Sequence, residues 1–277
     1  MEKELILKVK DLSYTYGHEK EVLKDINLSI YKGEKIAVLG HNGAGKSTFF
    51  LNINGVLTPD KGEIIYRGKA IGKKDLNKLR KNVGIVFQDA DNQIIASTVI
   101  GEVSFGPMNL KISKEEVKER VYSAMEYMNI TKFKDRPPHY LSGGEKKRVS
   151  IADIIAMKPE VIIFDEPTAS LDPLNISILE EVLEKLSVEN KTIMISTHDM
   201  DFAYRWADRV IVFDDGKVIE DGECLEVLKK LRSTESSNLK TPILLDVVEE
   251  LKSINIIKDE KIYPRTVKEL RDILKKM

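Results

Sequence analysis

The stretch Gly40-His41-Asn42-Gly43-Ala44-Gly45-Lys46-Ser47-Thr48 fits the phosphate-binding pattern G-x-x-x-x-G-K-[ST]. It follows an apolar run, residues 35–39, that is typical of a buried strand, and it leads into residues 48–51, which are typical of the first turns of a helix. In such a loop the backbone N–H groups surround a phosphate chain, Lys46 adds a positive charge and Ser47 offers a hydroxyl to Mg²⁺. A glycine-rich turn without a ligand is the alternative. The flanking strand and helix favour a site for ATP or GTP.

A second motif is an acidic pair at the end of an apolar strand. Residues 161–164 are apolar, and Asp165 and Glu166 follow directly. The C-terminal end of a central parallel strand can deliver a carboxylate to a metal ion, so we expect Asp165 to bind Mg²⁺ directly or through water. Glu166 would then reach the γ-phosphate and orient or deprotonate an attacking water. The simpler alternative is an exposed acidic pair that ends a strand before Pro167.

A third motif, Leu141-Ser142-Gly143-Gly144-Glu145, precedes an apolar helical run over residues 149–155. Ser-Gly-Gly at a helix start offers free N–H groups and the positive end of the helix dipole to an anion. The chain therefore has two segments that suit a phosphate. One nucleotide does not need both of them from the same chain.

With these three motifs the sequence resembles the ATP-binding cassette (ABC) ATPases. The resemblance implies an α/β fold of the P-loop NTPase type, with a mixed sheet core, an inserted helical subdomain and a small C-terminal helical extension. It also implies ATP and Mg²⁺ as cofactors and a head-to-tail arrangement of two chains. Ser142, Gly143 and Gly144 of one chain would then close over ATP held by the phosphate loop of the other.

Further family positions occur in the expected order along the chain. The resemblance makes Tyr16 the aromatic that stacks on adenine, with Tyr14 as a neighbouring candidate. It makes Gln88 the glutamine that links Mg²⁺ and water to the transport partner, and His198 the contact to the γ-phosphate. Residues 170–172 match the loop that crosses the dimer interface. Two features depart from or vary within the pattern: Glu145 replaces the usual glutamine, and His41 lies at a variable position of the phosphate loop.

The segment after Gln88 indicates a subclass. Asp89-Ala90-Asp91-Asn92-Gln93 resembles a short helix of the energy-coupling-factor importers and of the related cobalt and nickel importers, although Ala90 replaces the usual proline. The resemblance implies that Asp91 and Gln93 bind basic coupling helices of a membrane subunit, with the Asp91 carboxylate matched to an arginine. Residues 102–107 also resemble that group. A polar surface loop is the alternative.

The resemblance covers about residues 5–222, and it predicts an ABC domain over residues 1–222 with a helical subdomain at about 89–160. A capping box at 113–116 and the apolar spacing after it predict a helix over about 114–129. No heptads of a long coiled coil occur there, unlike in chromosome-maintenance and DNA-repair relatives. Two amphipathic helices, with start signals at 241–242 and 266–269, are predicted in the C-terminal extension, residues 223–277. They could pack on the parent domain or serve dimerisation, as in energy-coupling-factor ATPases.

Composition narrows the possible surroundings and partners. A net charge of −1 implies no general nucleic-acid-binding surface, and the single cysteine, Cys224, excludes an internal disulfide. No apolar run approaches the roughly 18 residues that would indicate a membrane span, and the N-terminus is unlike a signal peptide. We therefore expect a peripheral protein at the cytoplasmic face of the cell membrane, attached through partners.

These observations predict an ATP-hydrolysing subunit that energises an importer of the energy-coupling-factor or cobalt type by ATP-driven dimer closure. The expected partners are a second ATPase subunit, identical or paralogous, a transmembrane coupling subunit and a substrate-binding membrane subunit, with no nucleic acid. The alternatives are the ATPase subunit of another ABC transporter, or a soluble non-transport ABC protein. The latter would need a second cassette or a coiled-coil insertion. The sequence does not name the transported substrate, because another subunit selects it.

Overall fold

The centre of the molecule is a six-stranded sheet with the strand order β10-β9-β3-β8-β7-β6. The computed structural model describes residues 3–17, 20–169, 171–233 and 240–276. The strands of this sheet are β3 (Lys35–Leu39), β6 (Val83–Val86), β7 (Val161–Asp165), β8 (Thr192–Ser196), β9 (Arg209–Asp214) and β10 (Lys217–Glu223). Neighbouring strands are parallel except for β10, which pairs antiparallel with β9. Strands that are buried on both faces explain the continuous apolar runs of the sequence.

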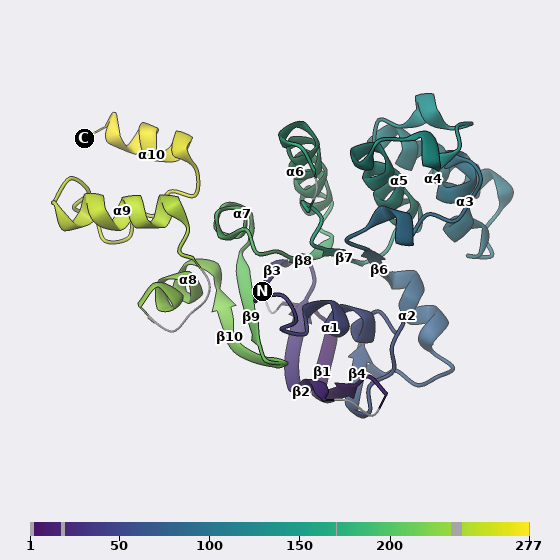
Figure 1. The fold of residues 1–277 in the computed structure, drawn as a ribbon, viewed down its shortest axis with the longest axis horizontal. Helices are drawn as coiled ribbons and strands as arrows, with labels where there is room; N and C mark the ends of the chain where they lie inside the picture. The colour runs from purple at the N-terminus through teal and green to yellow at the C-terminus, as the bar shows by residue number, and fades with distance from the viewer. Residues whose placement is uncertain (1–2, 18–19, 170, 234–239, 277) are drawn as a thin grey trace.

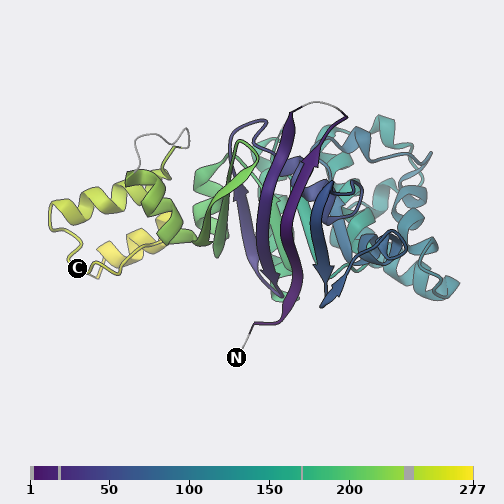
Figure 2. The ribbon, with the colours of Figure 1, turned by 90° about the horizontal axis from the view of Figure 1, so that it is seen from below.

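A second, antiparallel sheet has the order β2-β1-β4-β5. It consists of β1 (Leu5–Thr15), β2 (Glu21–Tyr31), β4 (Lys61–Tyr66) and β5 (Lys69–Ala70), and its two long strands run side by side in Figure 2. Helix α1 (Lys46–Ile53) contributes Phe49 and Phe50 to one core cluster with residues of both sheets. A short helix, α2 (Leu76–Asn82), leads into β6.

Helices α3 (Val99–Met108), α4 (Lys114–Tyr127) and α5 (Gly143–Ala156) form a helical subdomain at one end of the molecule (Figure 1). The predicted helix over 114–129 is confirmed, and it ends two residues early. Ser113 accepts a hydrogen bond from the backbone N–H of Glu116, as expected, but the Glu116 carboxylate pairs with Arg120 instead of closing the capping box. The subdomain is joined to the central sheet through β6 and β7.

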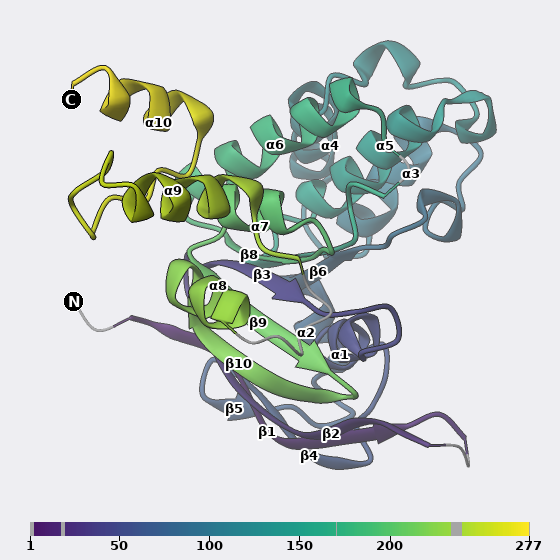
Figure 3. The ribbon, with the colours of Figure 1, turned by 60° about the vertical axis from the view of Figure 1, so that its left-hand side comes forward.

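Helices α8 (Cys224–Ser233), α9 (Ile243–Ser253) and α10 (Val267–Leu274) lie at the opposite end from the helical subdomain, as Figures 1 and 3 show. Helices α8 and α9 pack on the parent domain, because Leu228 and Leu245 belong to the main core cluster, whereas Leu270 of α10 packs with Val248 of α9 in a small separate cluster. Helix α7 (Met200–Trp206) lies next to α8, and α6 (Pro173–Val188) lies nearer the helical subdomain (Figure 1). The cap of α9 differs from the expectation: its first N–H, on Ile243, donates to Asp201 of α7 at 2.7 Å. Among the described residues, no helix is long and apolar enough to cross a membrane.

Candidate nucleotide site

The phosphate loop joins β3 to α1, so the predicted order of strand, loop and helix is confirmed. Two of its glycines are required by the backbone. A Cβ on Gly40 would lie 2.4 Å from the carbonyl oxygen of Phe213, and Gly45 has a φ of +104° just before the helix begins at Lys46. The free N–H groups of the first turn of α1 therefore face the loop, where an anion is favoured.

Lys46 is folded back onto its own loop. Its ammonium donates to the carbonyl oxygens of Gly40 at 2.7 Å and His41 at 3.1 Å, and it lies 3.8 Å from the Glu166 carboxylate. Burial lowers the pKa of Lys46, while the charges of Glu166 and Asp165 oppose that shift. The loop carbonyls hold the ammonium where phosphate oxygens could replace them as its partners.

The acidic pair lies at the carboxyl ends of β7 and β8. Asp165 and Ser196 are directly opposite in the register of these strands. The Ser196 hydroxyl donates to the Asp165 carboxylate at 2.6 Å and accepts the backbone N–H of Glu166 at 2.8 Å. Glu166 has a φ of +42°, a strained backbone of the kind that clusters at functional sites, and its carboxylate lies 3.1 Å from Nδ1 of His198. Ser196 was not among the predicted site residues, because its contacts depend on the pairing of β8 with β7.

The donor set suits Mg²⁺ that is shared with phosphates. Ser47 presents an exposed hydroxyl at the start of α1, Asp165 a carboxylate and Gln88 an exposed amide. Among the described residues, no group of three His, Cys, Asp or Glu side chains could hold a metal by itself. Mg²⁺ is typically bound by one or two protein oxygens, waters and nucleotide phosphates, so this sparse set of oxygen ligands fits it.

Tyr16 lies beside the phosphate loop, with its hydroxyl 3.3 Å from the Thr48 hydroxyl. The ring of Tyr14 meets it edge-on at 4.9 Å and packs against the core, whereas Tyr16 is exposed. The geometry therefore favours Tyr16 as the adenine-stacking candidate. His41 points out of the loop, 3.1 Å from the Asp214 carboxylate. At the tip of the loop, Asn42 and Gly43 are exposed and Ala44 is buried.

The third motif, Leu141-Ser142-Gly143-Gly144-Glu145, lies at the N-terminus of α5 and is called the signature segment below. Its structure gives a reason for the glutamate at position 145. The Ser142 hydroxyl accepts the N–H of Glu145, and the Glu145 carboxylate accepts the N–H of Ser142, which completes a capping box. The hydrogen bond from Ser142 lowers the pKa of Glu145. Its extra negative charge is thus used to cap its own helix. A Cβ on Gly143 would meet open space, whereas one on Gly144 would lie 2.4 Å from the side chain of Asn175 in α6.

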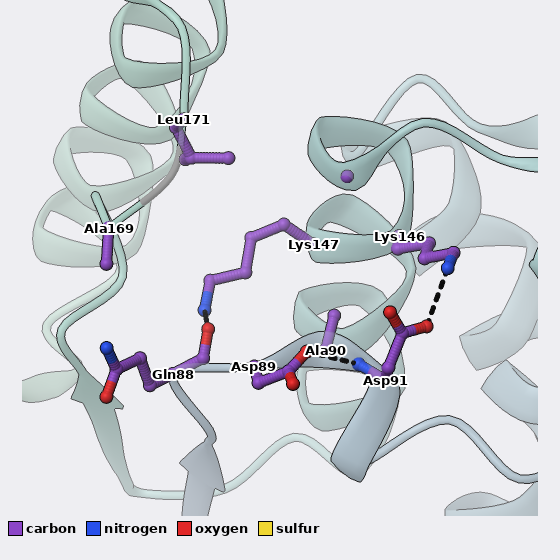
Figure 4. Close-up of a pocket in the computed structure, with 9 residues that line it drawn as sticks. Gln88, Asp89, Ala90, Asp91, Lys146, Lys147, Ala169 and Leu171 are labelled. Carbon is purple, nitrogen blue, oxygen red and sulfur yellow. Dashed lines mark hydrogen bonds and ion pairs between the residues drawn. The ribbon is translucent and has the colours of Figure 1, made fainter.

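A cavity of about 260 Å³ separates the signature helix from the segment after β6 (Figure 4). It is lined by Gln88, Asp89, Ala90, Asp91, Gly143, Lys146, Lys147, Ala169 and Leu171. The Lys147 ammonium donates to the carbonyl oxygens of Phe87 at 2.7 Å and Gln88 at 2.9 Å. Burial lowers the pKa of Lys147 to about 8, with Asp165 and Asp89 opposing the shift. Ser170 of the predicted interface loop lies outside the described residues.

The two predicted partner contacts, Asp91 and Gln93, lie differently. The Asp91 carboxylate pairs with Lys146 at 2.6 Å and stays 65% exposed, so it remains available to a partner. The Gln93 amide is used within the chain. It accepts the N–H of Phe87 at 3.2 Å and donates to the carbonyl oxygen of Ser150 at 2.9 Å. Gln93 therefore positions the segment within the chain, and its contact with a partner stays a prediction.

Comparisons with known proteins show the family to which the chain belongs. The family described as ABC transporter matches residues 23–169. The chain is 48% identical, over 89% of each sequence, to the energy-coupling factor transporter ATP-binding protein EcfA of Methanocaldococcus jannaschii. It is 40% identical to cbiO1 of Clostridium perfringens, described as part of the ABC transporter complex cbiONQ, with a TM-score of 0.75 over 91% of this chain and 96% of that one. The cassette MJ0796, a dimer bound to ADP and Pi, is 30% identical, with a TM-score of 0.71 over 79% of this chain and 99% of that one.

Proposed function

This chain belongs to the ABC transporter family of ATP-binding proteins, which are ATPases, and we propose that it energises an importer of the energy-coupling-factor or cobalt type. The observation that supports the ATPase site best is the cluster of Lys46, Asp165, Glu166 and His198 at the carboxyl ends of β3, β7 and β8, within one chain. The transport role is supported by the relatives named above.

Residues of the site would have separate tasks in hydrolysis. Lys46 would exchange its loop carbonyls for phosphate oxygens, and Ser47 and Asp165 would hold Mg²⁺, which supplies charge neutralisation on the phosphates when it is bound. Glu166 orients the attacking water and takes its proton. Ser196 fixes the backbone of Glu166 and the carboxylate of Asp165 through one hydroxyl. Removal of the Ser196 hydroxyl should therefore disturb both acids together.

Hydrolysis in this proposal needs a second ATPase subunit. Ser142 and Gly143 are exposed at the N-terminus of α5, and the position of a Gly143 Cβ is open. They are thus free to approach a phosphate held by another subunit, identical or paralogous. Closure of two subunits over two nucleotides, and reopening after hydrolysis, would then supply the motion for transport.

The contact with the transmembrane coupling subunit is proposed for the helical subdomain. Asp91 is exposed there, and three large apolar side chains nearby in the sequence are also exposed: Ile95 at 72%, Phe105 at 55% and Met108 at 70%. A basic, partly apolar coupling helix would match a subdomain that exposes both a carboxylate and large apolar side chains. This contact would place the chain at the cytoplasmic face of the membrane.

The C-terminal extension is a second candidate contact between ATPase subunits. Its helices keep Ile243, Val247, Ile254 and Val267 exposed, although Leu245 is buried against the parent domain. Exposed apolar side chains on one small helical unit suit a subunit contact.

Glu166→Gln tests the catalytic part of the proposal. The variant should bind ATP normally, lose turnover by at least about a hundredfold, as removal of a general base does, and accumulate as an ATP-bound dimer. Turnover near that of the wild type would reject Glu166 as the base.

Reconstitution of the complex in vesicles, with ATP-driven uptake of Co²⁺ and Ni²⁺ compared against a vitamin, tests the transport part. Uptake of neither ion would reject the cargo class.

A further inference from the structure

We propose that Lys147 is a positioning residue of the ATPase. It holds the Gln88 loop, residues 87–93, on helix α5, so that this loop moves with the signature segment. The inference rests on the proposed function, since it assigns Gln88 and the signature segment their roles there. Lys147 lies one helical turn after Gly143, with its side chain pointing across the cavity toward the main chain of Gln88 (Figure 4). It was not among the residues predicted from the sequence.

Several contacts tie residues 87–96 to the helical subdomain. On α5, Lys146 pairs with Asp91, Lys147 holds two carbonyls, and Ser150 accepts the Gln93 amide. On α3, the buried Glu102 carboxylate accepts the N–H groups of Ile95 at 2.9 Å and Ala96 at 2.7 Å. These polar contacts of the segment are all made to the helices, whereas the Phe87 side chain at its start packs against the core beside the sheet.

The attachment to the sheet ends just before this segment. Strand β6 pairs with β7 up to Val86, which is opposite Phe164. Phe87 is the next residue, and its carbonyl and N–H are already held by Lys147 and Gln93. A rotation of the helical subdomain against the sheet would thus be absorbed next to Val86, and Gln88 would travel with α5. When a partner's nucleotide draws Ser142 and Gly143 toward it, Gln88 would shift relative to Asp165 in the same chain.

The chemistry of Lys147 indicates that it does more than fill space. Its side chain is 4% exposed, and a buried ammonium is costly unless it is paired, whereas an apolar side chain of similar length at the same place is not. The two carbonyls satisfy the charge, and Gln88 itself is exposed, so water could serve these carbonyls if the lysine were absent. Stability alone therefore gives little reason for a lysine here. Control over the position of the Gln88 loop gives one.

The test compares the full-length wild type with Lys147→Met, which keeps the length of the side chain and removes its donors. The exposed Lys118 of α4 provides the control variant, Lys118→Met. Lys147→Met should reduce kcat for ATP about tenfold, equivalent to about 1.4 kcal/mol, with KM nearly unchanged because the phosphate loop is intact. Amide hydrogen exchange without nucleotide should become faster in residues 87–93 and stay the same in residues 40–47. Lys118→Met should match the wild type in both measurements.

Two results would overturn the proposal: exchange in residues 87–93 as slow as in the wild type, or a raised KM with an unchanged kcat. If Lys147→Met does not fold, Lys147→Gln, which keeps a shorter donor, replaces it. This variant should change kcat and the exchange of residues 87–93 in the same direction but by less. No change in either quantity would reject the role. A wild-type chain without ATPase activity would reject the proposed function instead. The exchange comparison would still decide whether Lys147 holds the loop.

Discussion

Asp153→Asn should remove a pH-dependent loss of stability that is located in the helical subdomain. Asp153 lies on α5, and burial raises its pKa from 3.8 to about 7, assisted by the negative charge of Glu102. The Gln93 amide, 3.4 Å away, opposes the shift only in part. A raised pKa means that the folded chain binds this proton more tightly than the unfolded chain does. Its contribution to stability is therefore complete below about pH 3.8 and is lost as the pH rises to 7 and above.

The size of the effect follows from the shift. A change of about three units corresponds to about 4 kcal/mol at about 1.36 kcal/mol per unit, which is an upper limit because the site can relax or admit water. An asparagine is similar in shape, cannot ionise, and can still accept from Gln93. The stability of Asp153→Asn relative to the wild type should therefore increase steadily from pH 5 to about pH 7 and change little between pH 7 and pH 8.

Urea unfolding, followed by circular dichroism at pH 5, 6, 7 and 8, measures this difference. Asp135→Asn is the control, because Asp135 is an exposed acid of the same subdomain. A difference between Asp153→Asn and the wild type that stays constant over this range would refute the reasoning. It would mean that Asp153 does not take up its proton within this pH range.

Three further predictions concern contacts between chains. Gly143→Asp should abolish ATPase activity and leave ATP binding by the monomer intact, because its Cβ meets open space within the chain; equal loss of both would argue against a site shared between subunits. Asp91→Lys should weaken capture of the coupling subunit, because the new lysine would repel its basic helix, and should leave nucleotide affinity normal. Thermal stability should change little, since the surface ion pair of Asp91 with Lys146 is worth about 0–1 kcal/mol. Normal capture would reject this contact. Ile254→Glu with Val267→Glu should reduce self-association in light scattering without lowering the melting temperature, and unchanged association would exclude the extension as a contact.

The sequence could predict the features that depend on neighbouring residues. The phosphate loop needs only a strand, glycines at left-handed positions and a helix, all of which are local signals. The capping boxes show the limit of prediction from local sequence signals. The same pattern forms a full box at Ser142, but at Ser113 and Thr266 the glutamates take other partners, Arg120 and the N–H of Arg265. A local pattern predicts the start of a helix reliably, whereas the partner of a long side chain depends on what the fold brings near it.

The features that the sequence missed depend on pairing between distant segments. Ser196 acts on Asp165 and Glu166 only because β8 lies beside β7 in one particular register. The inward direction of Gln93 depends on the position of α5, whose carbonyl oxygen at Ser150 is 57 residues away in the chain. The cap of α9 comes from Asp201, 42 residues before it. No spacing rule within one segment could have supplied these contacts.

Helix α5 connects the separate motifs into one mechanical unit. Its first turn presents Ser142 and Gly143 outward, its second turn holds the Gln88 loop through Lys147, and its third carries Asp153 beneath Gln93. Because one rigid helix carries all three, a displacement of its N-terminus by a partner's nucleotide must also displace the Gln88 loop and the neighbouring Asp91. The same displacement would then reach the proposed metal contact of this chain and its proposed contact with the membrane subunit, without a separate relay between them.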